Sequence, residues 1–213
     1  MTSPFRSRRA WTILLVVTVL GLVIDLASKS IAFERIADAP VSIDRAEVLE
    51  RLPSGTLSAL LPPHDPVVVI PRVLEFTLVL NPGAVFGIGG GKRVFFIVFT
   101  FVAVAFVLWI FGTWTRARDT LSHVAIGLLL SGGLGNLYDR ILFGCVRDFI
   151  HPLPGVRVAG REIWPYVSNL ADLFLLVGIA ILMLRSWRKE SGPEKDPSAE
   201  ATSDQPTDPA TSP

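Results

Sequence analysis

Four long apolar runs dominate this chain and limit what it can fold into. They cover about residues 11–33, 94–112, 121–142 and 170–187. Each approaches the roughly 20 residues that an α-helix needs to cross the hydrocarbon core of a bilayer. Because the apolar residues are continuous rather than alternating, a closed transmembrane β-barrel does not fit the pattern. The runs predict a mainly α membrane protein with four transmembrane helices.

The first run begins like a secretory signal peptide, because the sequence RSRR precedes an apolar stretch. No clear small-x-small cleavage site follows it, and Asp25 and Lys29 would be unusual inside the apolar part of a signal peptide. We therefore expect this run to remain as the first transmembrane helix.

Basic residues near the ends of the runs predict the orientation of the protein. They precede the first run, join the second to the third and follow the fourth: Arg6, Arg8, Arg9, Arg116, Arg118, Arg185, Arg188 and Lys189. With four spans, all of them fall on one side of the membrane. Both termini are therefore expected in the cytoplasm, and the segments 34–93 and 142–168 on the outside.

The first outside segment predicts a small periplasmic β-sheet between transmembrane helices 1 and 2. Residues 67–70 and 73–80 are rich in β-branched side chains with partial alternation, and the Gly-rich turn sequence NPGAVFGIGGGK follows them. Residues 36–65 give no functional prediction. The polar, Pro-rich segment 190–213 is expected to be a disordered cytoplasmic tail.

Charge, cysteine and histidine content argue against several functions. The chain has 20 Lys and Arg residues against 19 Asp and Glu residues and no basic–aromatic patch, so no nucleic-acid partner is expected. One cysteine, Cys145, is too few for an intrachain disulfide. The three histidines form no HExxH or HxH motif, so we expect no metal and no other cofactor.

Three polar pairs interrupt the apolar runs at helical spacing. They are Asp25 with Lys29, Asn136 with Arg140, and Asn169 with Asp172. With the predicted orientation, all three pairs lie toward the outer leaflet. Polar residues scattered for structural reasons would not need to share one depth, so this level of the membrane is the predicted site.

Some of these residues also have a purely structural interpretation. Asp25 and Lys29 can form an ion pair within one helix. Arg140 can extend its side chain to lipid phosphates. Asp139 can face an aqueous lumen or pair with Arg140.

The same holds for the amides. Asn136 and Asn169 can join helices by hydrogen bonds. Asn169 can also cap the N-terminus of the fourth helix, which would place Asp172 in its first turn, a favoured acidic position.

Two aspartates, Asp148 and Asp172, lie at the boundaries of apolar stretches, where a carboxylate is costly unless it is hydrated, paired or neutralised. If they converge, the two carboxylates share a proton. One can then act as a general base toward water while the other protonates the carbonyl oxygen of an amide. Serine chemistry and a Cys145 nucleophile have less support, because no histidine base stands near them in the sequence.

Five short motifs carry a family resemblance. They are DLASK at Asp25–Lys29, NPGAVFG at Asn81–Gly87, GGLGNLYDR at Gly132–Arg140, VRDF at Val146–Phe149 and NLAD at Asn169–Asp172. In this order on a four-span pattern, they resemble lipoprotein signal peptidase, the type II signal peptidase of bacteria. The resemblance covers about residues 11–187.

The resemblance implies an intramembrane aspartic endopeptidase of the bacterial inner membrane. Its substrate would be a diacylglyceryl-modified prolipoprotein, cut immediately before the lipidated cysteine. Asp148 and Asp172 match the catalytic pair of the family. Asp25, Lys29, Asn81, Asn136, Arg140 and Asn169 match positions that bind substrate or support the site. We expect residues 1–189 to form one peptidase domain that works as a monomer among membrane lipids, with its active site toward the outer leaflet.

The chain departs from the family in three places. The segment 36–65 is longer than the family usually needs, and the polar tail after Glu190 is additional. Arg147 stands where the family often has an apolar residue. Two other functions also fit the intramembrane charges: an ion relay in a transporter or channel subunit, and an assembly factor whose polar pairs only join helices. A relay would spread its carboxylates across the membrane, whereas a dyad requires Asp148 and Asp172 to meet near Asn81 and Arg140.

Overall fold

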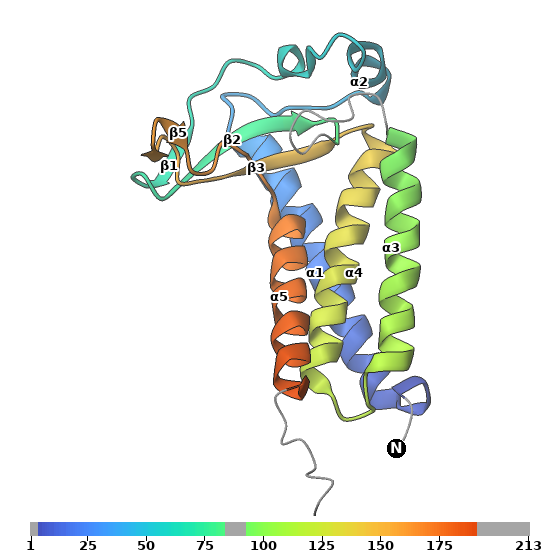
Figure 1. Cartoon of the computed structure of the whole chain (residues 1–213). Helices are drawn as coiled ribbons and strands as arrows, with labels where there is room; N and C mark the ends of the chain where they lie inside the picture. The colour runs from blue at the N-terminus through green and yellow to red at the C-terminus, as the bar shows by residue number, and fades with distance from the viewer. Residues whose placement is uncertain (1–3, 84–92, 191–213) are drawn as a thin grey trace, which may run out of the picture.

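A computed structural model describes residues 4–83 and 93–190. Within these ranges, four helices are long and apolar enough to cross a membrane: α1 (Arg8–Arg35), α3 (Arg93–Trp114), α4 (Thr120–Leu142) and α5 (Leu170–Glu190). They stand side by side as one bundle (Figure 1). Each contains one of the four predicted apolar runs. The predicted mainly α membrane fold is confirmed.

Helix α4 is the centre of the bundle. It packs against α1, α3 and α5. In the most apolar 18-residue stretch of α4, 67% of the residues are buried, compared with 6% in that of α3. Small residues allow this close packing. A Cβ added at Gly178 would lie 2.8 Å from the carbonyl oxygen of Ala125, and one added at Gly132 would strike the carbonyl oxygen of Ala171. The outward faces of α1, α3 and α5 carry large apolar side chains, as lipid contact requires.

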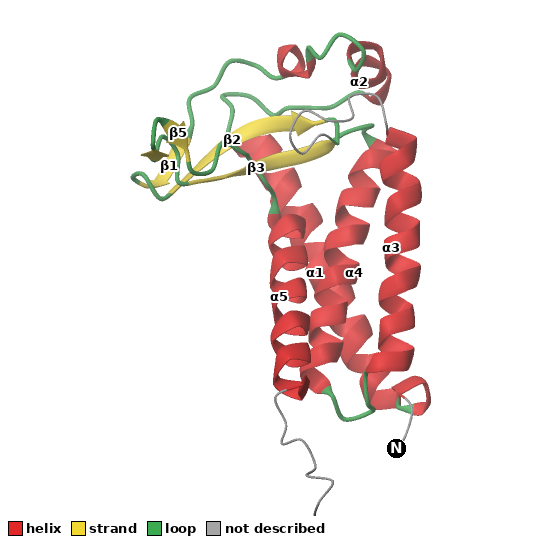
Figure 2. Ribbon diagram, viewed as in Figure 1, coloured by secondary structure: helices red, strands yellow, loops and turns green. Residues whose placement is uncertain are grey.

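A three-stranded antiparallel sheet lies across one end of the bundle (Figure 2). Its strands, in spatial order, are β1 (Val67–Ile70), β2 (Leu74–Asn81) and β3 (Val146–Pro152). The first two strands confirm the predicted sheet between transmembrane helices 1 and 2. The third strand comes from the segment after α4, and the sequence did not predict it. A separate two-stranded hairpin follows, β4 (Arg157–Val158) with β5 (Arg161–Glu162).

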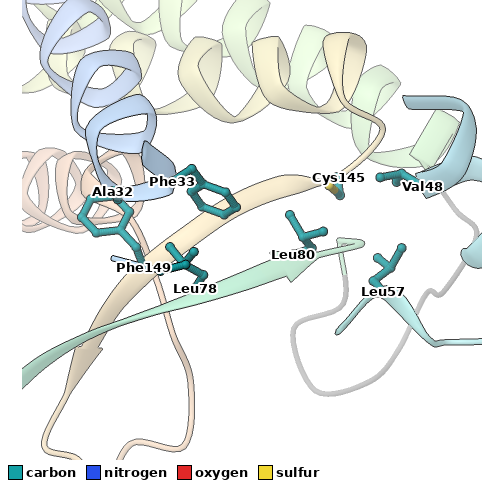
Figure 3. Packing of buried hydrophobic residues seen from close by; sticks show 9 residues of the cluster. Ala32, Phe33, Val48, Leu57, Leu78, Leu80, Cys145 and Phe149 are labelled. Atoms are coloured by element: carbon teal, nitrogen blue, oxygen red, sulfur yellow. The ribbon is translucent and has the colours of Figure 1, made fainter. Parts of the chain in front are cut away.

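The segment 36–65 covers the sheet on the side away from the bundle (Figure 1). It contains a short helix, α2 (Arg45–Arg51), and a 3₁₀ helix, η2 (Leu57–Leu60). Val48 and Leu57 from this segment share a buried apolar cluster with Leu80 of β2 and with Cys145 (Figure 3). Phe33 of α1 belongs to the same cluster, so the segment, the sheet and the end of α1 form one core.

His64 fixes the end of this covering segment to β2. Its Nε2 accepts a hydrogen bond of 2.9 Å from the backbone N–H of Leu78, and its Nδ1 lies 2.9 Å from the carbonyl oxygen of Pro62. Leu78 lies where the pairing of β2 with β3 shifts register, between Phe76 and Val79. The imidazole therefore satisfies a backbone donor that the strand pairing leaves open.

Two predictions fall outside the described residues. They concern the NPGAVFG motif beyond Gly83 and the tail from residue 191 onward.

Candidate active site

Asp148 lies in β3 with its side chain almost fully buried, at 1% exposure. Asn81 donates its amide to one carboxylate oxygen of Asp148 at 2.9 Å. Asn169 donates its amide to the other oxygen at 2.5 Å. The register pairs Asp148 with Val79, and Asn81 shares the face of Val79 because it lies two residues farther along β2. The sheet therefore brings together two residues that are 67 positions apart in the sequence.

Asp172 lies in the first turn of α5 and is held by a reciprocal cap. Asn169 accepts a hydrogen bond from the backbone N–H of Asp172 at 3.1 Å, and Asp172 accepts one from the backbone N–H of Asn169 at 3.3 Å. This arrangement is a capping box, which satisfies backbone donors at the start of a helix. The other carboxylate oxygen of Asp172 accepts the amide of Asn136 at 2.8 Å.

Asn169 therefore contacts both aspartates at once. Its side-chain carbonyl caps α5 above Asp172, and its side-chain amide reaches Asp148. The same amide lies 3.2 Å from the carbonyl oxygen of Asn136. The predicted cap is present, and the same side chain also donates to Asp148.

Asp148 holds its proton more tightly than an ordinary aspartate. Burial, with a smaller contribution from the charge of Asp172, raises its pKa to about 7. The hydrogen bonds from Asn81 and Asn169 favour the carboxylate and partly oppose this rise. The carboxyl group of Asp148 is therefore partly protonated near neutral pH.

A fully buried ion pair holds the residues that carry and contact Asp172. Lys29 donates to Asp25 at 2.8 Å and to the side-chain oxygen of Asn136 at 3.0 Å. The second oxygen of Asp25 accepts the backbone N–H of Ala171 at 2.9 Å, so it holds the first turn of α5. The predicted ion pair within α1 is present, and it fixes both Asn136 and the helix that carries Asp172.

Arg140 lies beside the same network. Its Nη1 donates to the backbone carbonyl of Asn136 at 3.2 Å, and its guanidinium lies over the ring of Phe96 at 5.1 Å. Its charge interacts with the carboxylates of Asp172 and Asp148. Arg140 therefore supplies a positive charge at the site.

Sequence reasoning missed one pair in this region. Asp139, fully buried at the end of α4, receives the guanidinium of Arg147 at 2.8 Å, and its other oxygen lies 3.7 Å from Lys29. From the sequence, Asp139 was expected to face an aqueous lumen or to pair with Arg140. No spacing rule relates a residue near the end of a helix to the second residue of the following strand.

The intramembrane carboxylates gather at one level instead of spreading across the bundle. Asp25, Asp139, Asp148 and Asp172 belong to one continuous set of contacts through Lys29, Asn136 and Asn169. This is the arrangement expected of a dyad with supporting charges, not of an ion relay. Within residues 4–83 and 93–190, no group of three or more His, Cys, Asp or Glu side chains is placed to hold a metal ion.

Cys145 is a poor nucleophile where it lies. The residue is fully buried in the apolar cluster between α2 and the sheet (Figure 3). Burial, together with the charges of Asp139 and Asp148, raises the pKa of its thiol to about 12. The thiolate needed for nucleophilic attack is therefore negligible near neutral pH.

Comparison with known proteins agrees with this geometry. The family described as signal peptidase (SPase) II matches residues 17–188. The lipoprotein signal peptidase of Halothermothrix orenii is 40% identical over 126 residues, which cover 59% of this chain and 79% of that protein. The lipoprotein signal peptidase of Syntrophotalea carbinolica is 35% identical over 143 residues, covering 66% and 84%.

A solved bacterial membrane enzyme has the same fold. It superposes with a TM-score of 0.59 over 86% of this chain and 92% of that chain, at 24% identity. The family match extends from within α1 to the end of the apolar part of α5, and it includes all five motifs and every residue of the network above. The chain therefore belongs to the signal peptidase II family.

Proposed function

We propose that this protein is an intramembrane aspartic endopeptidase. It removes the signal peptide from diacylglyceryl-modified prolipoproteins by cutting immediately before the lipidated cysteine. The observation that carries the proposal is the position of Asn169, whose side-chain amide binds Asp148 while its backbone N–H binds Asp172. Family membership supports the substrate class, since the relatives above are named lipoprotein signal peptidases.

The chemistry uses the proton that the two aspartates share. The ionised carboxylate accepts a proton from a water molecule as the water oxygen attacks the carbonyl carbon of the scissile amide. The protonated carboxyl group gives its proton to the carbonyl oxygen. When the tetrahedral intermediate collapses, the C–N bond breaks and the amino group of the cysteine leaves with a proton. The products are a signal peptide with a free carboxylate and a lipoprotein with a free amino terminus.

The neighbouring polar residues keep both carboxylates in position for this reaction. Asn81 and Asn169 donate to Asp148, and Asn136 donates to Asp172. Lys29 and Asp25 hold Asn136 and the start of α5. Arg140 supplies positive charge beside both carboxylates, where a developing oxyanion can be stabilised.

We place the protein in the bacterial inner membrane with both termini in the cytoplasm. Three groups of basic residues lie at the end of the bundle opposite the sheet (Figure 1). They stand near the start of α1, in the α3–α4 turn and near the end of α5. Arg9 donates to Thr120 at 3.2 Å, and Arg185 binds Asp119 at 2.7 Å. A positive end favours the cytoplasmic side. The sheet and the dyad then lie toward the outer leaflet, in a single peptidase domain of residues 1–189 that acts as a monomer among membrane lipids.

Cleavage of a purified, diacylglyceryl-modified prolipoprotein in a gel-shift assay tests the proposal. Asp148→Asn and Asp172→Asn are each expected to abolish cleavage while the protein still folds, shown by a cooperative thermal unfolding transition. Asp65→Asn is the matched control, since Asp65 is exposed in the covering segment, outside the network, and this variant should cleave normally. Full activity in either dyad variant would refute the aspartic mechanism.

A further inference from the structure

Arg147 is the residue at this site that neither the motifs nor the dyad explains. Its guanidinium is buried and contacts Asp139 through Nη2 at 2.8 Å and through Nε at 3.2 and 3.3 Å. Its backbone N–H donates to the same carboxylate at 3.0 Å. The guanidinium also lies over the ring of Phe143, 4.3 Å from its centroid. Such a two-pronged, stacked arrangement suits arginine and not lysine.

Arg147 completes a buried set of four charges, named here the quartet: Asp25, Lys29, Asp139 and Arg147. Lys29 lies 2.8 Å from Asp25 and 3.7 Å from Asp139, and Arg147 binds the free side of Asp139. The two anions and two cations sum to zero. Without Arg147, Lys29 would be the one cation of the quartet facing the two carboxylates of Asp25 and Asp139. These three groups would then carry one net negative charge.

This charge matters because the dyad lies against the quartet. Two charges act on Asp148 most directly, those of Lys29 of α1 and Asp172 of α5. Arg140 of α4 also interacts with its carboxylate, and the neutral thiol of Cys145 precedes its strand. Asp139 binds Arg147 and lies 3.7 Å from Lys29, so the charge of Arg147 is linked to Asp148 through Asp139 and Lys29. A net negative charge here would make each ionisation of the dyad harder, and a net positive charge would make it easier.

The geometry separates Arg147 from substrate chemistry. Successive residues of a strand point to opposite faces, so Arg147 and Asp148 face different sides of β3. Arg147 shares its face with Leu80, its partner in the sheet, and with Phe149. It therefore acts through Asp139 and through the peptide bond that precedes Asp148, as a positioning residue.

We infer that Arg147 sets the pH range in which the Asp148–Asp172 dyad works, by balancing the buried charge of Asp139. The inference rests on the proposed function, because it presumes that the dyad carries out the cleavage. It also explains how an arginine is accommodated where the family often has an apolar residue. The positive charge of Arg147 is neutralised by Asp139, so it adds no net charge beside the dyad.

The test is the pH dependence of cleavage of a lipidated prolipoprotein in a charge-changing mutant cycle. Arg147→Met keeps the apolar stem and removes the cation, so both limbs of the profile should move to higher pH by about half to one unit. Asp139→Asn removes the anion, so both limbs should move to lower pH. The double variant restores neutrality, and its limbs should return to the parental position even where its rate stays low.

A purely structural role gives a different result. If Arg147 only braces β3, the variants lose rate but the limbs stay at the parental pH, which would overturn the inference. Arg147→Lys keeps the charge and loses the two-pronged contact, so it should cleave more slowly with unmoved limbs. If the pH profile of Arg147→Lys shifted as much as that of Arg147→Met, the positive charge at position 147 would not be what sets the pH range. If Arg147→Met fails to fold, the other two variants still test the inference: the limbs should stay in place for Arg147→Lys and move to lower pH for Asp139→Asn.

Failure of the proposed function is recognised separately. If the dyad does not carry out cleavage, Asp148→Asn remains active in the same assay. If the dyad does so but Arg147 has no electrostatic role, Asp148→Asn is inactive and the limbs of the three charge-changing variants coincide with those of the parent.

Discussion

The side-chain amide of Asn169 lies 2.5 Å from a carboxylate oxygen of Asp148, although the two residues belong to different elements and are 21 positions apart. The side-chain carbonyl of the same asparagine caps α5 and so fixes the turn that carries Asp172. One residue therefore couples the start of a transmembrane helix to a strand of the sheet.

Replacement of Asn169 should separate its two roles. Serine is a good N-cap but is too short to reach Asp148, so Asn169→Ser should keep α5 capped and lose the amide contact. A hydrogen bond to a charged group is worth about 1.5–3 kcal/mol, which corresponds to a loss of about 10- to 100-fold in the cleavage rate. Single-turnover cleavage measures the rate, and the thermal midpoint reports the cap. Asn169→Ala should lose both rate and midpoint, and a fully active Asn169→Ser would show that the amide contact is dispensable.

The pKa of Asp148 predicts how cleavage depends on pH. Burial and the charge of Asp172 raise this pKa to about 7. The reaction needs one shared proton, and that proton is lost as the pH rises through this value. Cleavage should therefore decline on the alkaline side of about pH 7, measured as the initial rate at saturating substrate. A rate that stays constant up to pH 9 would contradict a dyad with this proton affinity.

The same raised pKa predicts a pH dependence of stability. The folded protein holds a proton on Asp148 that the unfolded chain releases at the ordinary value of 3.8. The stability from this proton is fully present below that value and is lost as the pH rises to about 7. The thermal midpoint of Asp148→Asn should therefore rise relative to the parent between pH 4 and pH 8. A constant difference between the two midpoints would show that Asp148 is ionised throughout this range.

Two glycines of α4 should differ in their tolerance of alanine. A Cβ at Gly135 would collide with a carboxylate oxygen of Asp25 that Lys29 already holds at 2.8 Å. Overpacking of this kind costs about 1–3 kcal/mol, so Gly135→Ala should lower the thermal midpoint and slow cleavage. Gly133→Ala is the matched control, because its Cβ would meet only Thr100, at 3.8 Å. Equal midpoints for the two variants would mean that Asp25 can move away at little cost.

The parts of the fold that depend on local sequence were predictable. Hydropathy alone locates the four helices, because a helix in lipid needs a continuous apolar run. Helical spacing also gives the ion pair of Asp25 with Lys29 and the cap of Asn169 with Asp172, since both pairs lie within one turn. These contacts need no knowledge of the tertiary structure.

The contacts that complete the site depend on tertiary structure and were not predictable from local pattern. Strand β3 forms because β2, from the segment before α3, lies beside it, and its own seven residues carry no clear alternation. Asn81 reaches Asp148 only through this pairing. The contact of Arg147 with Asp139 likewise requires the chain to turn back at the end of α4. The family resemblance supplied the dyad, whereas residue spacing supplied only its depth in the membrane.

The buried thiol should be chemically silent and dispensable for cleavage. Cys145 is fully buried, and its pKa is raised to about 12. Cys145→Ala should cleave lipidated prolipoprotein at close to the parental rate, because the thiol packs among apolar side chains such as Val48 and Leu80 and only one small group is removed. The folded parent should resist maleimide labelling at pH 7.5 and react fully after denaturation. Loss of cleavage in a folded Cys145→Ala variant would reopen thiol chemistry.

The covering segment 36–65 should stabilise β2 through His64. The Nε2 of His64 accepts the backbone N–H of Leu78, so His64→Ala leaves a partly buried donor without its partner, at a cost of about 1–3 kcal/mol. Hydrogen exchange across Leu74–Asn81 should accelerate in this variant, and β2 carries Asn81 to the dyad. His64→Gln retains an acceptor and should exchange more slowly than His64→Ala. Exchange at the parental rate in both variants would mean that pairing with β1 and β3 holds the strand without His64. The covering segment would then contribute only apolar contacts, through residues such as Val48 and Leu57.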